Sequence, residues 1–281
     1  MNNEIQLKNI NKKFKSKIAL NKVNLSFDQK KIYGLLGPNG SGKTTLFNII
    51  AGFLKPDSGE IYLNEKNLIN YSLNDRSAFG ISYLPQEASI FRDLNVYENI
   101  LSIAQLFHKK NDAKLVSNKL VKLFSLERFI ETKGKLLSGG ERRRTEIARA
   151  LASNPKYLLL DEPFAGIDPI AIEDVKDTIL KLKNSGIGII VTDHNVREAL
   201  KIVDYANIIY NGEIVKEGTP NVIIKDEFVK KSSKNTGISS EVGLLRAELG
   251  SEDISKKQRN HRKSDEKKQY KFYYFVVFCW F

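Results

Sequence analysis

The stretch Leu137-Ser138-Gly139-Gly140-Glu141 has the composition of a turn that binds an anion and opens a helix. Ser138 offers a hydroxyl, and Gly139 and Gly140 let backbone N–H groups come close to a charged ligand. We expect a helix over residues 141–151, whose N-terminus favours the same negative charge. The stretch is therefore predicted to clamp a phosphate group.

A complete phosphate-binding loop lies nearer the N-terminus, at Gly37-Pro38-Asn39-Gly40-Ser41-Gly42-Lys43-Thr44. It fits the pattern G-x-x-x-x-G-K-[ST] between an expected strand at 31–36 and an expected helix at 45–51. We expect backbone N–H groups, as far as Thr45, to wrap the phosphates of a nucleotide, with Lys43 reaching the outer ones and the Thr44 hydroxyl on Mg²⁺. A glycine-rich turn that binds nothing is the alternative, and the flanking strand and helix disfavour it. Because one nucleotide needs one such clamp, Ser138 is predicted to reach a nucleotide of another subunit.

Two acids end the apolar run 157–160, which reads as a buried parallel strand. Ligands of open α/β sheets bind at the carboxyl ends of such strands. Asp161 is predicted to hold Mg²⁺ through water, and Glu162 to be the general base that polarises the attacking water. The alternative for an adjacent Asp-Glu pair is a solvated turn, which this position disfavours.

Three more polar residues follow expected strands or the acid pair. His194 follows a strand at 187–191, so we expect it at the same sheet edge, where it would contact the γ-phosphate and orient water. Gln86 follows a strand at 81–84; its amide can ligate Mg²⁺ and sense the γ-phosphate. Asp168 is predicted to bridge to a partner subunit, with an ordinary helix N-cap as the alternative.

Together these residues resemble the ATP-binding cassette (ABC) ATPases over residues 4–225, with every signature element in the family's order. In the family's terms the elements are the Walker A loop, the Q-loop at Gln86, the signature at 137–141, the Walker B acids, the D-loop at 165–168 and the switch His194. The resemblance implies that Phe14 stacks on adenine, although a core position for Phe14 is the alternative. It also implies a head-to-tail dimer with two ATP molecules, each held by the 37–44 loop of one subunit and Ser138–Gly140 of the other.

Longer strings are similar to the lipopolysaccharide-export ATPases of Gram-negative envelopes. They are residues 83–92, 137–144, 161–170 and 192–198. Asp93 departs from this pattern, in which a second basic residue is expected after Arg92. Branched-chain amino acid importer ATPases share parts of the strings and are the near alternative.

The composition agrees with a subunit whose membrane-spanning part is supplied by other subunits. The chain has 281 residues, enough for a substantial core, and its single cysteine, Cys279, excludes an internal disulfide and suits a reducing cytoplasm. Residues 1–10 carry no apolar signal-peptide core, and no apolar run approaches the roughly 20 residues of a spanning helix. The formal charge of +12 is scattered along the chain, which makes nucleic acid an unlikely partner.

Hydrophobic periodicity predicts an α/β fold with an antiparallel β layer, a mainly parallel core sheet and a helical insert at about 95–150. The resemblance implies that this fold is a P-loop ABC ATPase with a RecA-like core sheet and a helical subdomain. The antiparallel strands are expected near 4–10, 18–28 and 60–63, and the core strands at 31–36, 81–84, 157–160, 187–191 and 205–210. Helices are expected at 96–107 and 112–124. Asn211-Gly212 predicts a hairpin turn, and Thr219-Pro220 the start of a last helix.

Residues 231–281 differ from the ATPase domain predicted at 1–230. The segment 232–271 is polar and highly charged, so most of the tail is predicted to lack stable structure. The apolar, aromatic run 272–281 is too short to span a bilayer. An interfacial position, packing on a partner and an accident of the terminus all remain open.

The predicted function is ATP hydrolysis that drives lipopolysaccharide extraction and export. The resemblance implies a homodimer under two transmembrane permease subunits, on the cytoplasmic face of the inner membrane. We expect residues 88–97 to line the groove that receives a helix of each permease, with Phe91 as apolar anchor; packing of Phe91 inside the helical insert is the alternative. A soluble ABC ATPase acting on ribosomes or nucleic acid is a further alternative, disfavoured because the chain has one cassette and no coiled coil.

Overall fold

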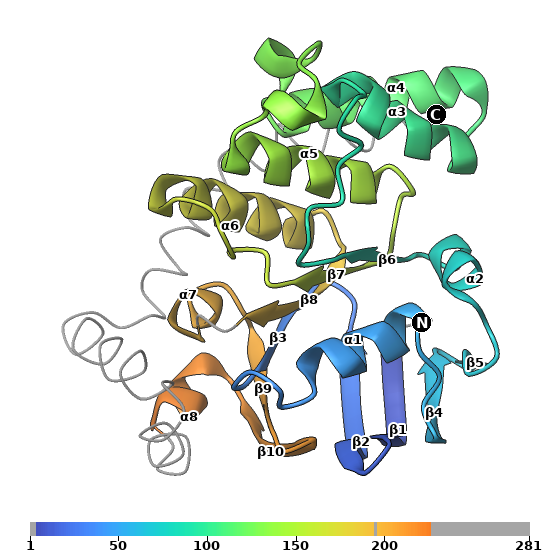
Figure 1. Ribbon diagram of the computed structural model, residues 1–281, viewed down its shortest axis with the longest axis vertical. Helices are drawn as coiled ribbons and strands as arrows, with labels where there is room; N and C mark the ends of the chain where they lie inside the picture. Colours follow the sequence, from blue (N-terminus) through green and yellow to red (C-terminus); the bar gives the residue numbers. More distant parts are fainter. Residues whose placement is uncertain (1–3, 194–195, 226–281) are drawn as a thin grey trace. The chain divides into compact units, whose positions relative to one another are not determined.

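A four-stranded antiparallel sheet begins the fold (Figure 1). The computed structural model describes residues 4–193 and 196–225. Apolar residues such as Ile5, Leu7 and Ile10 point into the core, and polar residues lie between them. The sheet has the order β2-β1-β4-β5, with strands β1 (Glu4–Phe14), β2 (Lys17–Asp28), β4 (Ser58–Leu63) and β5 (Lys66–Asn67). The predicted antiparallel layer is therefore confirmed.

The second sheet has six strands in the order β10-β9-β3-β8-β7-β6. Its centre is parallel, and only β10 runs antiparallel, in a hairpin with β9 at Asn211-Gly212. Every residue of β3, β7 and β8 is buried, as expected of parallel strands covered on both faces. The strands are β3 (Ile32–Leu36), β6 (Ile81–Leu84), β7 (Tyr157–Asp161), β8 (Gly188–Asp193), β9 (Tyr205–Tyr210) and β10 (Glu213–Gly218), which confirms the predicted core sheet.

Strand register brings the carboxyl ends of the central strands to one edge. Leu36 at the end of β3 pairs with Asp193, and Asp161 at the end of β7 pairs with Thr192. β6 continues the same edge, because its last residue, Leu84, pairs with Leu160. The phosphate-binding loop, the acid pair and Gln86 all follow directly from these ends, so pairing alone places them on one side of the sheet.

Helix α1 (Lys43–Ala51) packs between the two sheets. Its buried residues, including Phe47 and Ile50, belong to one apolar cluster with Phe27 of β2 and Ile190 of β8. The remaining helices of this part are α2 (Leu73–Ala78), α6 (Pro169–Asn184), α7 (Val196–Leu200) and α8 (Pro220–Lys225). The last helix begins at Pro220, as predicted.

The helical insert forms its own layer, drawn in green beyond α6 in Figure 1. Helix α3 (Val96–Phe107) has the predicted bounds, α4 (Lys110–Leu123) begins two residues earlier than predicted, and α5 is Gly139–Leu151. Short 3-10 turns lie at Glu127–Phe129 and Gly134–Leu136. The early start of α4 escaped prediction because its first turn is polar and exposed, and such a turn gives no apolar periodicity.

Helix α2 was not predicted from the sequence, because its residues are mainly polar and few in number. Arg76 is 1% exposed and explains why the helix forms where it does. Its guanidinium donates to the carbonyls of Ile49 and Ile50 at the end of α1, and to those of Leu68 and Tyr71. Burial lowers the Arg76 pKa to about 10. Four carbonyl partners thus replace the water that this guanidinium loses.

Two sets of predictions fall outside the described residues. His194 is one, and the tail at 231–281 is the other. Within residues 4–193 and 196–225, no helix combines the length and the apolar character needed to cross a membrane.

We predict that Arg76→Met lowers the free energy of unfolding by about 2–4 kcal/mol, because buried carbonyls lose their donors while the volume is kept. Thermal and urea unfolding would measure the change. Arg128→Met is the matched control, since Arg128 is exposed on a 3-10 turn. Equal stability of the two variants would contradict the structural role of Arg76.

Candidate functional site

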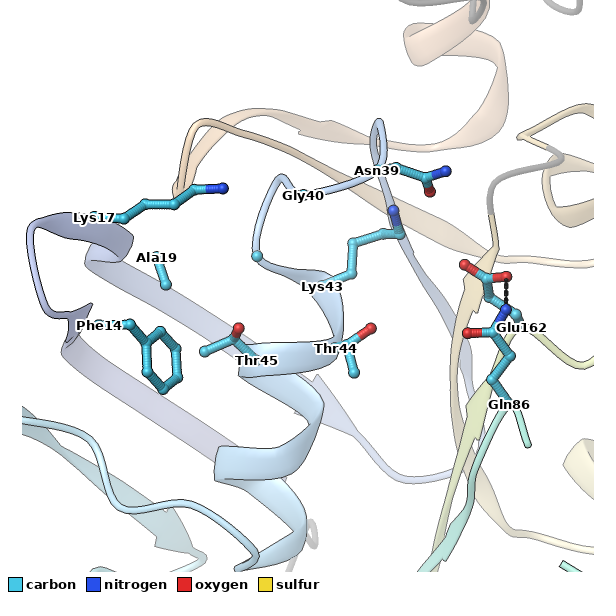
Figure 2. Close-up of a pocket in the computed structure, with 11 residues that line it drawn as sticks. Phe14, Lys17, Ala19, Asn39, Gly40, Lys43, Thr44, Thr45, Gln86 and Glu162 are labelled. Atoms are coloured by element: carbon cyan, nitrogen blue, oxygen red, sulfur yellow. Dashed lines mark hydrogen bonds between the residues drawn. The ribbon is translucent and has the colours of Figure 1, made fainter. Parts of the chain in front are cut away.

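A cavity of about 560 Å³ opens between the two sheets, beside the start of α1 (Figure 2). Its volume is within the range of ligand sites. Phosphate-loop residues form one wall, and residues of β1 and β2 form another. The lining residues are Phe14, Lys17, Ala19, Asn39, Gly40, Gly42, Lys43, Thr44, Thr45, Gln86 and Glu162.

The loop between β3 and α1 is compressed against the antiparallel sheet. Gly42 has a φ of 113°, and a Cβ there would lie 2.6 Å from the carbonyl oxygen of Ala19. Only glycine fits this position. The tight turn sets the next residue, Lys43, at the start of α1 with its side chain inside the loop.

Lys43 is 5% exposed, and its ammonium donates to the carbonyl oxygens of Gly37 (2.7 Å) and Pro38 (3.0 Å). Burial lowers the pKa of Lys43, and the carboxylates of Glu162, Asp161 and Asp193 act against that shift. The buried Lys43 ammonium is suited to bind a phosphate group, and the acids that it faces are suited to a metal ion.

Ser41 places a buried hydroxyl in the phosphate-binding loop. Its side chain is 3% exposed, and within the described part of the chain its hydroxyl has no hydrogen-bond partner. A buried hydroxyl without a partner is costly unless a ligand or water satisfies it. With the loop N–H groups and Lys43 beside it, Ser41 fits a phosphate oxygen.

Asp161 ends β7 with each carboxylate oxygen accepting a hydrogen bond. The Thr192 hydroxyl donates to Oδ1, and the Tyr83 hydroxyl donates to Oδ2 at 3.2 Å. Asp161 is 1% exposed, and burial raises the pKa of its carboxyl despite these two donors. The tyrosine and the threonine were not anticipated from the sequence, because neither lies in a nucleotide motif.

Glu162 lies beside Gln86, as the shared sheet edge predicted. The Gln86 amide donates to Glu162 Oε2 at 2.8 Å (Figure 2). The Glu162 backbone is held by its N–H, which donates to the carbonyl and hydroxyl oxygens of Thr192 at 3.0 and 3.1 Å. Its φ of 44° is unusual for a residue other than glycine and directs the carboxylate into the cavity.

The three residues predicted to hold Mg²⁺ carry oxygen donors suited to it. Thr44, with a hydroxyl, and Gln86, with an amide oxygen, line the cavity, whereas Asp161, with a carboxylate, is buried at the end of β7 and is not among the lining residues. Since the amide nitrogen of Gln86 is on Glu162, its oxygen turns toward the side of the cavity where the Thr44 hydroxyl lies (Figure 2). Hard oxygen ligands of this kind fit the metal proposed for these three residues.

The signature stretch lies at the start of α5. Ser138 is its exposed N-cap and forms a capping box with Glu141. A Cβ on Gly140 would lie 2.8 Å from that of Ala171, so glycine permits close packing of α5 and α6. Residues 138–140 are not among those that line the described cavity. A nucleotide in this cavity therefore leaves the Ser138 clamp available to another molecule.

Two buried ions of α5 were missed by the sequence analysis. The Arg143 guanidinium donates to the carbonyls of Pro85 (3.1 Å) and Asp161 (3.2 Å), and pairs with Glu146 at 3.2 Å. Glu146 in turn accepts from the N–H of Ser89. Their i,i+3 spacing was visible in the sequence, although such pairs usually lie on a solvated face.

The other predicted site residues differ in exposure and partners. Phe14 is 47% exposed and lines the cavity, so its alternative as a core residue is wrong. Asp168 Oδ1 accepts a hydrogen bond from the N–H of Ala171 at 3.0 Å, as the helix N-cap alternative predicts. The bridge from Asp168 to a partner subunit stays a prediction. Lys17 lines the cavity without having been predicted. His194 lies outside the described residues.

The parallel core sheet, the loop at the start of α1 and the acids at the end of β7 define a P-loop nucleotide hydrolase. Residues 20–165 match the family described as ABC transporter. The chain belongs to this family and is an ABC-type ATPase.

Relatives from several bacteria carry the name lipopolysaccharide export system ATP-binding protein LptB. The one from Escherichia coli K12 is 45% identical over 229 residues, which are 80% of this chain and 94% of the relative. The one from Haemophilus influenzae is 44% identical over 225 residues, 79% of this chain and 93% of the relative. The likeness thus extends over nearly their whole length.

Solved ATP-binding cassettes confirm the fold. MJ1267, an ATP-binding cassette in its ADP conformation, superposes with a TM-score of 0.74 at 29% identity, covering 82% of this chain and 97% of that one. MJ0796, a dimeric cassette bound to ADP and phosphate, gives 0.70 at 28% identity, with 77% and 98% covered.

We predict that Lys43→Ala and Glu162→Gln separate binding from turnover. Lys43→Ala loses a charge in the phosphate loop and should weaken ATP binding about tenfold or more. Glu162→Gln keeps the shape of the side chain and should bind ATP while turnover falls about a hundredfold or more. Fluorescent-nucleotide titration and phosphate release would measure both.

Lys55→Ala provides the control, because Lys55 is exposed and lies outside the cavity lining. Near-wild-type hydrolysis by Glu162→Gln would remove Glu162 from the mechanism. Unchanged ATP affinity of Lys43→Ala would do the same for Lys43.

Proposed function

We propose that the chain is the ATP-hydrolysing subunit of a lipopolysaccharide exporter, bound to two transmembrane subunits on the cytoplasmic face of the inner membrane. The observation that carries this proposal is the 45% identity over 94% of the Escherichia coli relative. Identity over this share of the relative includes residues away from the nucleotide motifs.

Within the proposed mechanism, the 37–44 loop and Lys43 hold the phosphates, and Phe14 stacks on the adenine. Glu162 takes a proton from the attacking water, and His194 and Gln86 orient that water. Thr44, Gln86 and Asp161 would hold Mg²⁺, which would neutralise charge on the phosphates. The Gln86–Glu162 hydrogen bond must lengthen before water can reach the carboxylate from that side.

The proposed working unit is a head-to-tail homodimer. The exposed Ser138 hydroxyl and the N–H groups of 139–140 would clamp the outer phosphates of ATP held by the partner, and Asp168 would contact the partner's site. The dimeric state of the MJ0796 cassette supports this arrangement. ATP binding then closes the dimer, and hydrolysis reopens it.

The proposed permease contact is at Phe91, which is 44% exposed. The Arg149 guanidinium of α5 lies 4.7 Å from its ring centroid, and buried Asn99 hydrogen-bonds to both the N–H and the carbonyl of Phe91. The phenyl ring is thus presented by a fixed backbone, as an interface anchor requires. Packing of Phe91 wholly inside the insert does not agree with its exposure.

Asp93, the departure from the expected basic residue, pairs with Lys135 at 2.9 Å. The same segment is joined to 130–135 by backbone bonds, including Lys135 N–H to the carbonyl of Arg92. This acid therefore belongs to the support of the segment and leaves the Phe91 ring accessible.

The chain on both sides of Gln86 is attached to α5 by Arg143, Glu146 and Arg149. Arg143 binds the carbonyl of Pro85, Glu146 binds the N–H of Ser89, and Arg149 binds the Ser89 hydroxyl at 2.7 Å. A permease helix seated on Phe91 would act on this rigid unit, and Gln86 would carry the displacement to Glu162. This continuity supports coupling between the membrane partner and ATP.

We predict that Phe91→Ala weakens assembly with the permease subunits about tenfold or more, because an interface anchor is lost. Pull-down of the permeases in detergent would measure assembly, with hydrolysis by the isolated subunit as the check on folding. Leu115→Ala is the control, since Leu115 is 58% exposed on α4. Intact assembly by Phe91→Ala, or equal loss by both variants, would contradict the proposed contact.

The exporter function is tested by replacing the corresponding subunit of Escherichia coli. We expect this chain to support growth and surface lipopolysaccharide in cells depleted of their own export ATPase, and Glu162→Gln to fail. Reconstitution of the chain with its co-purified native membrane subunits in vesicles provides the second measurement. ATP-dependent uptake of an amino acid by that complex, without release of lipopolysaccharide, would overturn the proposal.

A further inference from the structure

We propose that Tyr83 is a positioning residue that fixes the Asp161 carboxylate for the metal ion. The inference rests on the proposed Mg²⁺ site. It concerns a residue outside the nucleotide motifs, at the end of β6 next to the strand that carries the acid.

The two oxygens of Asp161 receive donors from the two neighbouring strands. Thr192 of β8 donates to Oδ1, and Tyr83 of β6 donates to Oδ2 at 3.2 Å. β7 lies between β8 and β6, so the donors approach from opposite sides. A carboxylate held at both oxygens cannot turn about its Cβ–Cγ bond without losing a hydrogen bond.

The tyrosine ring is itself held by the region of α1. Phe47 of α1 meets it edge to face at 6.5 Å between centroids, and Phe53, just beyond the helix, does so at 5.5 Å. Phe47 is fully buried and Phe53 is 57% exposed, so the ring packs against the core on the side of Phe47. Because α1 begins at Lys43 and Thr44, the same helix positions the Thr44 hydroxyl and, through Tyr83, the Asp161 carboxylate.

This common support matters for a metal with strict geometry. Mg²⁺ demands near-octahedral coordination at short distances, and a tilted carboxylate or a displaced water ligand weakens it. Outer partners that orient metal ligands typically change metal affinity by about 10–100-fold when they are removed. Tyr83 is therefore expected to affect metal affinity more than affinity for the nucleotide itself.

The test is Tyr83→Phe, which removes one oxygen and keeps the ring between Phe47 and Phe53. The Mg²⁺ concentration for half-maximal hydrolysis should rise about tenfold. Mn²⁺ binding in the presence of ATP, followed by electron paramagnetic resonance, should weaken by a similar factor. ATP affinity in EDTA should stay as in the unmodified protein.

Tyr157→Phe is the matched control. Tyr157 lies at the opposite end of β7, and its buried hydroxyl donates to the carbonyl of Phe27 at 3.1 Å. This variant should lose thermal stability without any change in metal dependence. An unchanged metal dependence of Tyr83→Phe, or an equal change in Tyr157→Phe, would overturn the inference.

Asp161→Asn distinguishes an error in the proposed metal site from an error in the role of Tyr83. If Asp161→Asn leaves Mn²⁺ binding unaltered, the metal site itself is wrongly placed. If it weakens binding and Tyr83→Phe does not, only the role of Tyr83 fails. In the Asp161→Asn background, Tyr83→Phe should have no further effect on metal affinity. Should Tyr83→Phe fail to fold, Thr192→Val removes the donor on the other oxygen of Asp161. Its effect is read from Mn²⁺ binding alone, because the Thr192 hydroxyl also accepts a hydrogen bond from the N–H of Glu162. Mn²⁺ binding should weaken, and unchanged Mn²⁺ binding would overturn the inference.

Discussion

Parallel pairing of four neighbouring strands is the constraint on which this protein depends. β3, β8, β7 and β6 share one direction and one register, so the chain must leave each of them at the same edge. Backbone hydrogen bonds and burial of both faces maintain that order whatever the loops contain. The loops that follow these strands carry polar groups, and each loop places its polar group at the carboxyl edge of the sheet. Sheet topology therefore determines where the site lies, and the side chains of the loops determine its chemistry.

The helical insert is attached to that edge by polar contacts deep in the protein. Burying a guanidinium costs free energy, and removing the charged partner of a buried ion is strongly destabilising. Arg143 is 6% exposed and binds one carbonyl before Gln86 and another at Asp161, with Glu146 balancing its charge, while its Nε has no hydrogen-bond partner among the described residues. Apolar packing tolerates small sliding, whereas these directional contacts do not. α5 therefore moves together with the backbone on either side of Gln86, and a tilt of the insert reaches the catalytic edge directly.

Local patterns determined what the sequence could predict. The 37–44 loop, the acids at 161–162 and Gln86 each follow a short apolar run, so their place at the sheet edge could be inferred without a structure. The bounds of α3 were equally clear, because Asn95 caps it and apolar residues recur along one side. Contacts between distant residues were different. Tyr83 meets Asp161 across 78 positions, and Arg143 meets Pro85 across 58, and no local pattern encodes either distance. α2 is short and mainly polar, and two of the four carbonyls that hold Arg76 belong to another helix, so no local pattern indicated it either.

The backbone at Glu162 has a consequence for anyone who wants a trapped, long-lived form of this protein. A side chain with a Cβ at φ 44° stores conformational strain, of order 1 kcal/mol or more. Glutamine would keep that strain, whereas asparagine and glycine adopt the left-handed region at lower cost. A stable crystallisation form would therefore carry Asn or Gly at this position, with a higher melting temperature than the active protein. The proposed role of Glu162 as general base gives a reason for keeping a residue that this backbone conformation does not favour.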